Sequence, residues 1–321
     1  MSLPASLEGQ LRIPVIGAPM FIVSGPELVL AQCKAGIVGA FPALNARPES
    51  MLDEWLARIS EELAAYQSAN PGLTVAPFAV NQIVHQSNNR LQHDVEMCVK
   101  YQVPIVITSL RPPAEVVAAV HGYGGFVFHD VINVRHARKA IDQGVDGIIT
   151  VCAGAGGHAG TTSPFALVKE VREIFDGTII LSGSMSHGND VLAAQAMGAD
   201  LAYLGTRFIA TREANAPSAY KEMIVDSAAT DIVYTNLFTG VHGSYLKGSI
   251  VNAGLDPGDL PEGELRTMNF GGGGSTKAKA WRDIWGAGQG VGTIDDIPSV
   301  ADLVDRMEAE YRDAATRLCA P

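Results

Sequence analysis

The chain alternates short apolar stretches, rich in β-branched residues, with longer stretches in which apolar residues recur at helical spacing. The short stretches are apolar throughout instead of at every second position, which is typical of strands buried on both faces of a parallel sheet. The pattern predicts eight strands, at residues 15–20, 37–41, 74–81, 104–109, 126–131, 147–152, 178–182 and 201–204.

Helical stretches lie between these strands and favour a repeated β/α architecture. Eight is the number of strands at which such a sheet closes into a barrel. An open doubly wound sheet is the alternative, but it usually has fewer strands, and no GxGxxG motif follows the first strand here. The sequence therefore predicts an α/β fold, a (β/α)8 barrel. Its helices are expected at residues 25–35, 49–66, 88–101, 114–121, 134–143, 165–175 and 190–197.

The regular alternation stops near Ile209. Residues 210–297 are rich in glycine and polar residues, and we expect them to form a smaller lid or substrate subdomain packed over the barrel mouth. A final helix is predicted at residues 299–318, where apolar positions recur at helical spacing. The barrel is thus expected to comprise residues 1–209 and the C-terminal segment 298–321.

Composition narrows the class of protein. The 321 residues suit one barrel, and a 47% share of hydrophobic residues can fill a sizeable core. A net charge of −11 argues against nucleic acid or an anionic membrane as the main partner. It does not exclude a small anionic ligand, which responds to the charges of its own pocket. No stretch approaches the roughly 20 apolar residues of a membrane helix.

The four cysteines are scattered without a CxxC pair, so neither a disulfide framework nor a zinc knuckle is expected. The eight histidines include no HExxH motif and no ligand cluster, and we expect no metal. The N-terminus has neither the basic nor the apolar region of a signal peptide. We therefore expect a cytoplasmic protein with reduced cysteines. The pattern leaves the oligomeric state open, a homodimer being one expectation.

The loops after the seventh and eighth strands are made of small residues. In barrels these two loops commonly form a phosphate site, because small residues let backbone N–H groups approach an oxygen and a helix N-terminus adds partial positive charge. We expect helix N-caps nearby at Ser186 and Asn189. Glycines alone would equally make tight turns, but their presence in both loops favours phosphate. The residues are Ser182, Gly183, Ser184, Gly205 and Thr206.

After the sixth strand comes a glycine-rich loop, residues 153–160, with His158 as its one titratable group. Histidine exchanges a proton near neutral pH. A loop almost without side chains lets a flat ring lie against the backbone while the histidine reaches over it. A solvated loop histidine is the alternative, but its isolation among glycines at a strand end favours a proton-transfer role.

Other strand ends carry weaker signals. Asn81 and Gln82 follow the third strand, and an amide there can hydrogen-bond the edge of a ring, although for Gln82 a turn cap is favoured. Residues 271–277 resemble a phosphate loop superficially but lack the GK[ST] order. Residues 281–292 (WRDIWGAGQGVG) either line the pocket or pack the insertion, and we favour packing for the two tryptophans.

Taken together, these motifs resemble those of the nitronate monooxygenase family, formerly called 2-nitropropane dioxygenases. The resemblance covers nearly the whole chain, and GGHxG followed by GTRF is a fairly specific pair. It implies a TIM barrel with a smaller second domain, and FMN as cofactor. The matching segments are GAPM (17–20), AVNQ (79–82), AGGHAG (155–160), LSGS (181–184), AMGADLAYLGTRF (196–208) and WGAGQGVG (285–292).

The resemblance also implies roles. His158 matches the family's catalytic histidine, which can deprotonate a nitroalkane to its nitronate. In this family a nitronate gives an electron to FMN, and oxygen completes the conversion to a carbonyl compound and nitrite. Gly157 and Asp130 are expected beside the cofactor. The FMN phosphate would be held by Ser182, Gly183, Ser184, Gly205 and Thr206, and the isoalloxazine contacted by Ala18, Pro19, Met20 and Asn81.

Two positions depart from the family pattern. Ser184 stands where many relatives have a second glycine, and its N–H still serves if its backbone angles are ordinary. Asp130 stands where some relatives carry a lysine, so a positive charge near the flavin is lost. A carboxylate there would more naturally accept hydrogen bonds from ribityl hydroxyls. The electrostatics of the flavin, and with it the oxidant, are therefore open.

Nitronate oxidation is the first hypothesis, with a small-molecule substrate and O2 as partners. The same fold and loops occur in NAD(P)H:quinone reductases and enoyl-acyl carrier protein reductases, which accept hydride from a nicotinamide. Barrels like inosine-monophosphate dehydrogenase share the phosphate loops but need a nucleophilic cysteine in the sixth loop, and Cys152 is not well placed for that. A non-enzymatic flavin store or sensor would not need His158.

Overall fold

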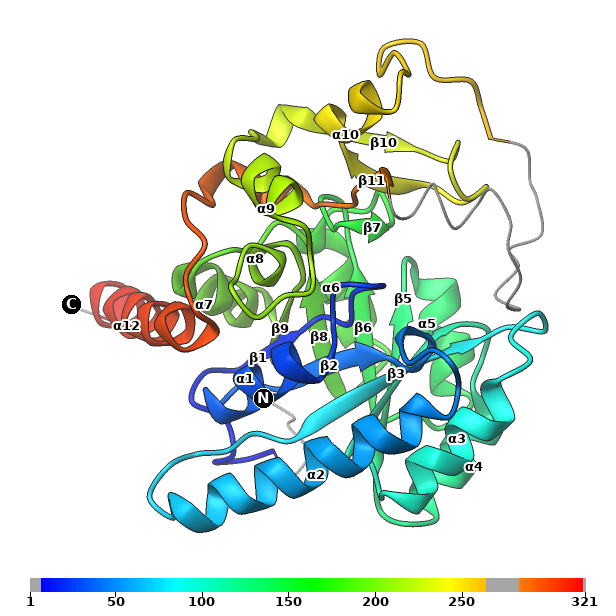
Figure 1. Cartoon of the computed structure of the whole chain (residues 1–321), viewed down its shortest axis with the longest axis vertical. Helices are drawn as coiled ribbons and strands as arrows, with labels where there is room; N and C mark the ends of the chain where they lie inside the picture. The colour runs from blue at the N-terminus through cyan, green and yellow to red at the C-terminus, as the bar shows by residue number, and fades with distance from the viewer. Residues whose placement is uncertain (1–6, 264–282, 320–321) are drawn as a thin grey trace.

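Eight parallel strands form one sheet in the order β1-β9-β8-β6-β5-β4-β3-β2 in the computed structural model, which describes residues 7–263 and 283–319 (Figure 1). The Gly17 N–H donates to the Val38 carbonyl at 2.8 Å, which joins the two ends of the sheet and closes the barrel. The predicted (β/α)8 barrel is confirmed. Its strands are β1 (Val15–Gly17), β2 (Gly39–Pro42), β3 (Phe78–Val84), β4 (Ile105–Leu110), β5 (Phe126–Val131), β6 (Gly147–Val151), β8 (Thr178–Ser182) and β9 (Leu201–Leu204).

Helices surround the barrel, and α12 lies along α7 (Figure 1). Strand boundaries differ from the predicted ones where proline interrupts the ladder. Pro19 and Pro77 have no N–H to donate, so β1 ends before the first and β3 begins after the second. The helices are α1 (Pro26–Lys34), α2 (Met51–Ala69), α3 (Leu91–Lys100), α4 (Ala114–His121), α5 (Val134–Ile141), α6 (Pro164–Arg172), α7 (Gly188–Met197), α8 (Thr206–Ile209) and α12 (Val300–Cys319).

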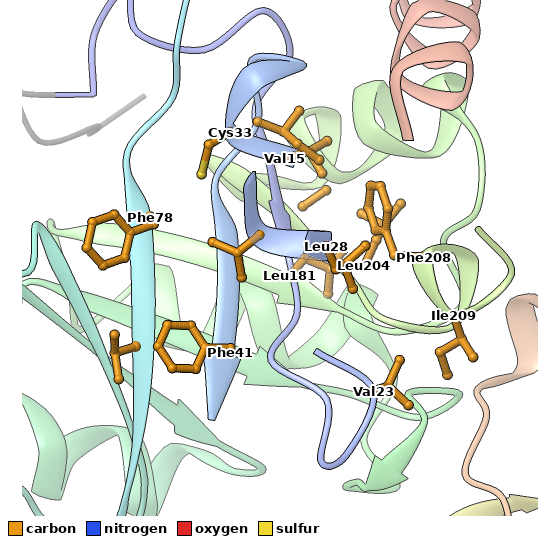
Figure 2. Close-up of a cluster of buried hydrophobic side chains, with 14 of the residues drawn as sticks. Val15, Val23, Leu28, Cys33, Phe41, Phe78, Leu181, Leu204, Phe208 and Ile209 are labelled. Carbon is orange, nitrogen blue, oxygen red and sulfur yellow. The ribbon is translucent and has the colours of Figure 1, made fainter. Parts of the chain in front are cut away.

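The core has two layers because successive side chains of each strand point to opposite faces. Inward-facing residues such as Ile107, Phe128 and Ile180 fill the barrel interior and are completely buried. Outward-facing residues such as Phe41 and Leu181 pack under the helices (Figure 2). Burial on both faces explains why the strands read as continuous apolar stretches.

The segment after the barrel strands contributes to a second sheet of three antiparallel strands, in the order β10-β11-β7, above the barrel mouth (Figure 1). Strand β10 is Ile232–Thr235, β11 is Gly243–Leu246, and β7 is Gly157–His158 in the connection after β6. His158 lies opposite Gly243. The expected flexible loop around His158 is thus partly a strand, because a partner far along the chain pairs with it.

The described part of this segment also contains helices α9 (Ser218–Val225) and α10 (Lys247–Asn252) and the 3-10 helices η2 (Ala229–Asp231) and η3 (Gln289–Thr293). The boundary between barrel and lid at residues 209 and 210 stays a prediction. Within the described ranges, none of the helices is both long and apolar enough to cross a bilayer. Residues 271–277, predicted not to bind phosphate, lie outside the described residues.

Candidate functional site

A cavity of about 630 Å³ lies between the carboxyl ends of the barrel strands and the second sheet. Its volume is in the range of cofactor and small-molecule sites. All the residues predicted for the site line this one cavity, although their individual roles stay predictions. They are Ala18, Pro19, Met20, Asn81, Asp130, Gly157, His158, Ser182, Gly183, Ser184, Gly205 and Thr206.

His158 is held by the second sheet. Its Nε2 lies 2.9 Å from the hydroxyl of Thr239, which comes from the segment between β10 and β11. The Thr239 hydroxyl also donates to the Val241 carbonyl at 2.9 Å. Burial lowers the pKa of His158 to about 4, so its imidazole is neutral at pH 7. The side chain is therefore oriented over the cavity in a form that can accept a proton.

The loops after β8 and β9 present backbone N–H groups to the cavity. In the described chain, those of Gly183, Ser184, Gly205 and Thr206 have no acceptor, which makes them available to an anion. A Cβ added to Gly183 would lie 2.9 Å from the Ala153 carbonyl, so this position needs a glycine. The cradle fits an oxyanion such as a phosphate.

The condition stated for Ser184, ordinary backbone angles, is not met. Its φ is +54°, in the left-handed region that non-glycine residues rarely adopt. The preceding Gly183 lies close to the loop after β6, and its own φ of +146° is also positive. The left-handed conformation of a non-glycine residue costs on the order of 1–3 kcal/mol and tends to occur at functional sites.

The predicted contribution of the next helix terminus is wrong. The N-cap of α7 is His187, and neither Ser186 nor Asn189 fills that position. The Asp190 carboxylate accepts the Ser186 and His187 N–H groups at 2.8 and 2.9 Å, and Glu310 accepts the Gly188 N–H at 2.7 Å. These carboxylates use the donors of the helix terminus, so α7 offers them to no ligand.

A glycine-rich turn at residues 286–290 forms part of the same wall. The Gly288 N–H donates to the Thr206 hydroxyl at 2.9 Å, and the Gln289 N–H donates to the Gly154 carbonyl at 2.9 Å. A Cβ on Gly288 would lie 2.5 Å from that carbonyl. The turn is therefore wedged between the loops after β6 and β9.

The sequence interpretation favoured packing for both tryptophans near this turn. Trp285 does pack, stacked on Tyr220 with ring centroids 4.9 Å apart, but it also lines the cavity. The interpretation was therefore incomplete for Trp285, and Trp281 lies outside the described residues. The glycines at every second position of the turn were the signal that chain segments approach each other closely here.

Three polar side chains form a chain along the ends of β3, β4 and β5. The Asn81 amide donates to the Ser109 hydroxyl at 2.9 Å, and Ser109 donates to Asp130 at 2.5 Å. Burial raises the pKa of Asp130 to about 6 despite this hydrogen bond. Asp130 is thus a second titratable group of the cavity. Gln82 instead lies in the core against Cys98, so it is neither a ligand nor the favoured turn cap.

The loops after β1, β4 and β5 carry exposed apolar residues that the sequence analysis missed. We call Phe21, Ile22, Leu110 and Ile132 the apolar collar; each lines the cavity and is 36–41% exposed. Ile22 and Leu110 have φ of +68° and +81°. The four collar residues lie at or shortly after strand ends. In the sequence they therefore resemble the ordinary apolar residues of strand ends.

The sequence profile of the nitronate monooxygenase family matches residues 79–310. The chain belongs to this family. A nitronate monooxygenase from Paraburkholderia phytofirmans is 25% identical over 95% of this chain and 94% of its own length. Membership confirms the predicted resemblance.

Two further likenesses are informative. A Rhodococcus jostii protein named (3aS,4S,5R,7aS)-5-hydroxy-7a-methyl-1-oxo-octahydro-1H-indene-4-carboxyl-CoA dehydrogenase is 25% identical over 75% of this chain, and the match spans 64% of that relative's length. The structure of FabK from Thermotoga maritima superposes with a TM-score of 0.77 at 23% identity, covering 99% of both chains. The second likeness supports the fold alone.

Within this family fold, Cys152 is no nucleophile. Burial raises the pKa of its thiol to about 11, so it is protonated at neutral pH. This agrees with the expectation that the chain is not a barrel of the inosine-monophosphate dehydrogenase kind. Among the residues that the structure describes, histidines, cysteines and carboxylates form no group of three that could hold a metal ion.

Proposed function

We propose that the protein binds FMN and oxidises alkyl nitronates with O2 to a carbonyl compound and nitrite, using His158 for proton transfer. The observation that carries the proposal is a neutral histidine held over a cavity whose neighbouring loops, after β8 and β9, offer free backbone N–H groups. Family membership supports the reaction class. The proposal also extends to nitroalkanes, which the histidine would first deprotonate.

The residues fit FMN on two counts. The N–H cradle of residues 183–184 and 205–206 suits a phosphate, and the small residues 154–157 together with Ala18 leave room for a flat ring. The FMN phosphate would be bound by the cradle, and Asn81 and Asp130 would face polar atoms of the cofactor. When bound, FMN supplies an electron acceptor that O2 reoxidises.

His158 determines which substrates this chain can handle. With a pKa of about 4, the neutral imidazole accepts a hydrogen bond or a proton at its unprotonated nitrogen at pH 7. An anion bound against the ring raises that pKa, because opposite charges favour the protonated form. An anionic nitronate thus matches the site better than a neutral nitroalkane, and we expect it to be the faster substrate.

A second candidate is a reductase or dehydrogenase that takes hydride from NAD(P)H, as quinone and enoyl reductases do. The observation in its favour is the name of the Rhodococcus jostii relative, a dehydrogenase acting on a CoA ester. Asp130 adds to it, because a carboxyl at the cofactor in place of a cation alters the balance between oxidants.

Anaerobic mixing of the FMN-loaded protein separates the candidates. We expect propane-2-nitronate to bleach the flavin absorbance within seconds, and equimolar NADH or NADPH to leave it unchanged over the same time. His158→Asn should retain FMN, measured by its absorbance after gel filtration, but lose most of the rate with a neutral nitroalkane, which this residue would have to deprotonate. Rapid bleaching by a nicotinamide with none by nitronate would favour the second candidate instead.

A further inference from the structure

The apolar collar brings large, partly exposed apolar side chains to the cavity. Phe21 and Ile22 follow β1, Leu110 ends β4, and Ile132 follows β5, so the collar lines the cavity on three loops. Clustered exposed apolar residues mark binding surfaces more often than chance. The collar therefore offers apolar contact to a ligand larger than the reacting group beside His158.

Backbone strain supports this interpretation independently. The left-handed region suits glycine or asparagine, yet Ile22, a β-branched residue, occupies it. Two asparagines hold it there: the Ile22 N–H donates to Asn45 at 2.9 Å, and Asn215 donates to the Ile22 carbonyl at 3.0 Å. Leu110 shows the same conformation. Such strain persists only where surrounding contacts enforce it, and here it aims apolar side chains at the cavity.

A positively charged side chain, Arg47, lies next to the apolar collar. Arg47 lines the cavity with its guanidinium 5.3 Å from the centre of the Phe21 ring. In the described part of the chain, no carboxylate pairs with it. The described lining contains one carboxyl group, Asp130, which lies deeper at the end of β5. A cation thus borders the collar in a protein whose net charge is −11.

We propose that the substrate is an apolar chain of several carbons that ends in an oxyanion, a carboxylate or a phosphate. The chain lies along the apolar collar, and Arg47 binds the terminal oxyanion through charge-assisted hydrogen bonds. The reacting group lies beside His158, so this assignment rests on the proposed function for its chemistry. Its binding part stands on the collar and Arg47 alone.

Turnover by the FMN-loaded enzyme tests whether the substrate carries an apolar carbon chain. Terminal nitronates of three to ten carbons, each with and without an ω-carboxylate, are compared by kcat/KM. We expect a rise of roughly fourfold for each methylene that contacts the collar, and a further gain of about tenfold from the carboxylate at the length that reaches Arg47. Equal values for propane and decane nitronates would overturn the assignment.

Calorimetry tests the binding without turnover. Decanoate and decyl phosphate are titrated into the FMN-loaded protein, and decan-1-ol serves as the uncharged reference. We expect Arg47→Met to weaken the tighter anion about tenfold and leave decan-1-ol unchanged, while Arg47→Lys recovers part of the loss. Whichever anion binds more tightly identifies the terminal group.

A substitution in the collar completes the design. Ile22→Asn keeps a residue that tolerates the left-handed conformation but removes the apolar side chain, and we expect all three ligands to bind several-fold more weakly. Val251→Asn is the control, since Val251 is 52% exposed and does not line the cavity. Undiminished binding in both the Arg47→Met and Ile22→Asn proteins overturns the inference. Normal binding effects without nitronate turnover would instead overturn only the proposed reaction.

Discussion

The two walls of the cavity recognise ligands by different means. The wall formed by the loops after β6, β8 and β9 consists largely of glycine and small residues, and it presents backbone N–H groups. The wall formed by the loops after β1, β2, β4 and β5 presents side chains, namely the apolar collar and Arg47. A backbone wall suits a ligand that does not change, such as a cofactor phosphate, whereas side chains can vary with the substrate.

Both walls contain strained backbone, but for opposite purposes. Three of the four described non-glycine residues with positive φ line the cavity: Ile22, Leu110 and Ser184. At Ser184 the strain lies in the N–H cradle, where two chain segments approach each other closely. At Ile22 and Leu110 the strain holds large apolar side chains partly exposed at the cavity. Strain of this kind tends to occur at functional sites, and both walls of the cavity contain it.

The largest effect is expected at His158, where the two walls meet. His158→Asn should lower kcat for a neutral nitroalkane by about 10²–10⁴-fold, the usual range for a lost proton-transfer residue, while FMN stays bound. Thr239→Val should lower kcat about tenfold, because the ring loses the hydroxyl that orients it. Thr239→Ser should restore most of that loss. Steady-state kinetics measures kcat for each variant, with flavin content as the control. An unchanged kcat in His158→Asn contradicts the proton-transfer role of this residue.

The backbone wall is tested by a single methyl group. Gly288→Ala places a Cβ within 2.5 Å of the Gly154 carbonyl, so the loops must move apart. We expect FMN affinity to fall about 100-fold, measured by flavin fluorescence quenching, with the collar ligands less affected. Gly72→Ala is the matched control, since a Cβ there meets nothing within 4 Å. FMN binding equal to wild type in Gly288→Ala would refute the assignment of this wall.

The burial of Asp130 predicts a pH dependence of the free energy of unfolding that comes from this one carboxyl group. Its pKa of about 6 is above the ordinary value of 3.8, so its contribution to stability is complete below 3.8 and is lost as pH rises through about 6. Asp130→Asn should therefore raise the free energy of unfolding at pH 8 relative to wild type. The exposed Asp142→Asn should not. Urea denaturation at both pH values, for the three proteins, measures the difference, and its absence would place Asp130 in a solvated environment.

The smallest effect concerns the strain in the collar. Ile22→Gly removes an apolar side chain but also the left-handed penalty, whereas Ile132→Gly removes a similar side chain without positive φ. We expect Ile22→Gly to be the more stable of the two by about 1 kcal/mol. Thermal unfolding of both variants tests this. If Ile132→Gly proves equally stable, the left-handed conformation of Ile22 costs no free energy, and Ile22 is not a strained residue.

The barrel and its cavity were predictable from local sequence. Apolar stretches mark strands buried on both faces, and strand ends such as Asp130 and Ser182 must meet at one mouth. What could not be predicted depends on contacts between distant residues. The pairing of His158 with Gly243 is one case, and the capture of the α7 donors by Glu310 is another. The positive φ of Ile22 requires Asn45 and Asn215, which no local pattern connects.

The pairing of β7 with β11 has a consequence for how the enzyme comes into being. The barrel strands end at Leu204, but the strand that aligns His158 is made only when residues 243–246 have been added. A chain that stops after the barrel could close its sheet and still lack an aligned histidine. The apolar collar and Arg47 belong instead to loops of the barrel, which are complete before the second sheet is made. The alignment of His158 and the side-chain wall of the cavity therefore come from different parts of the chain.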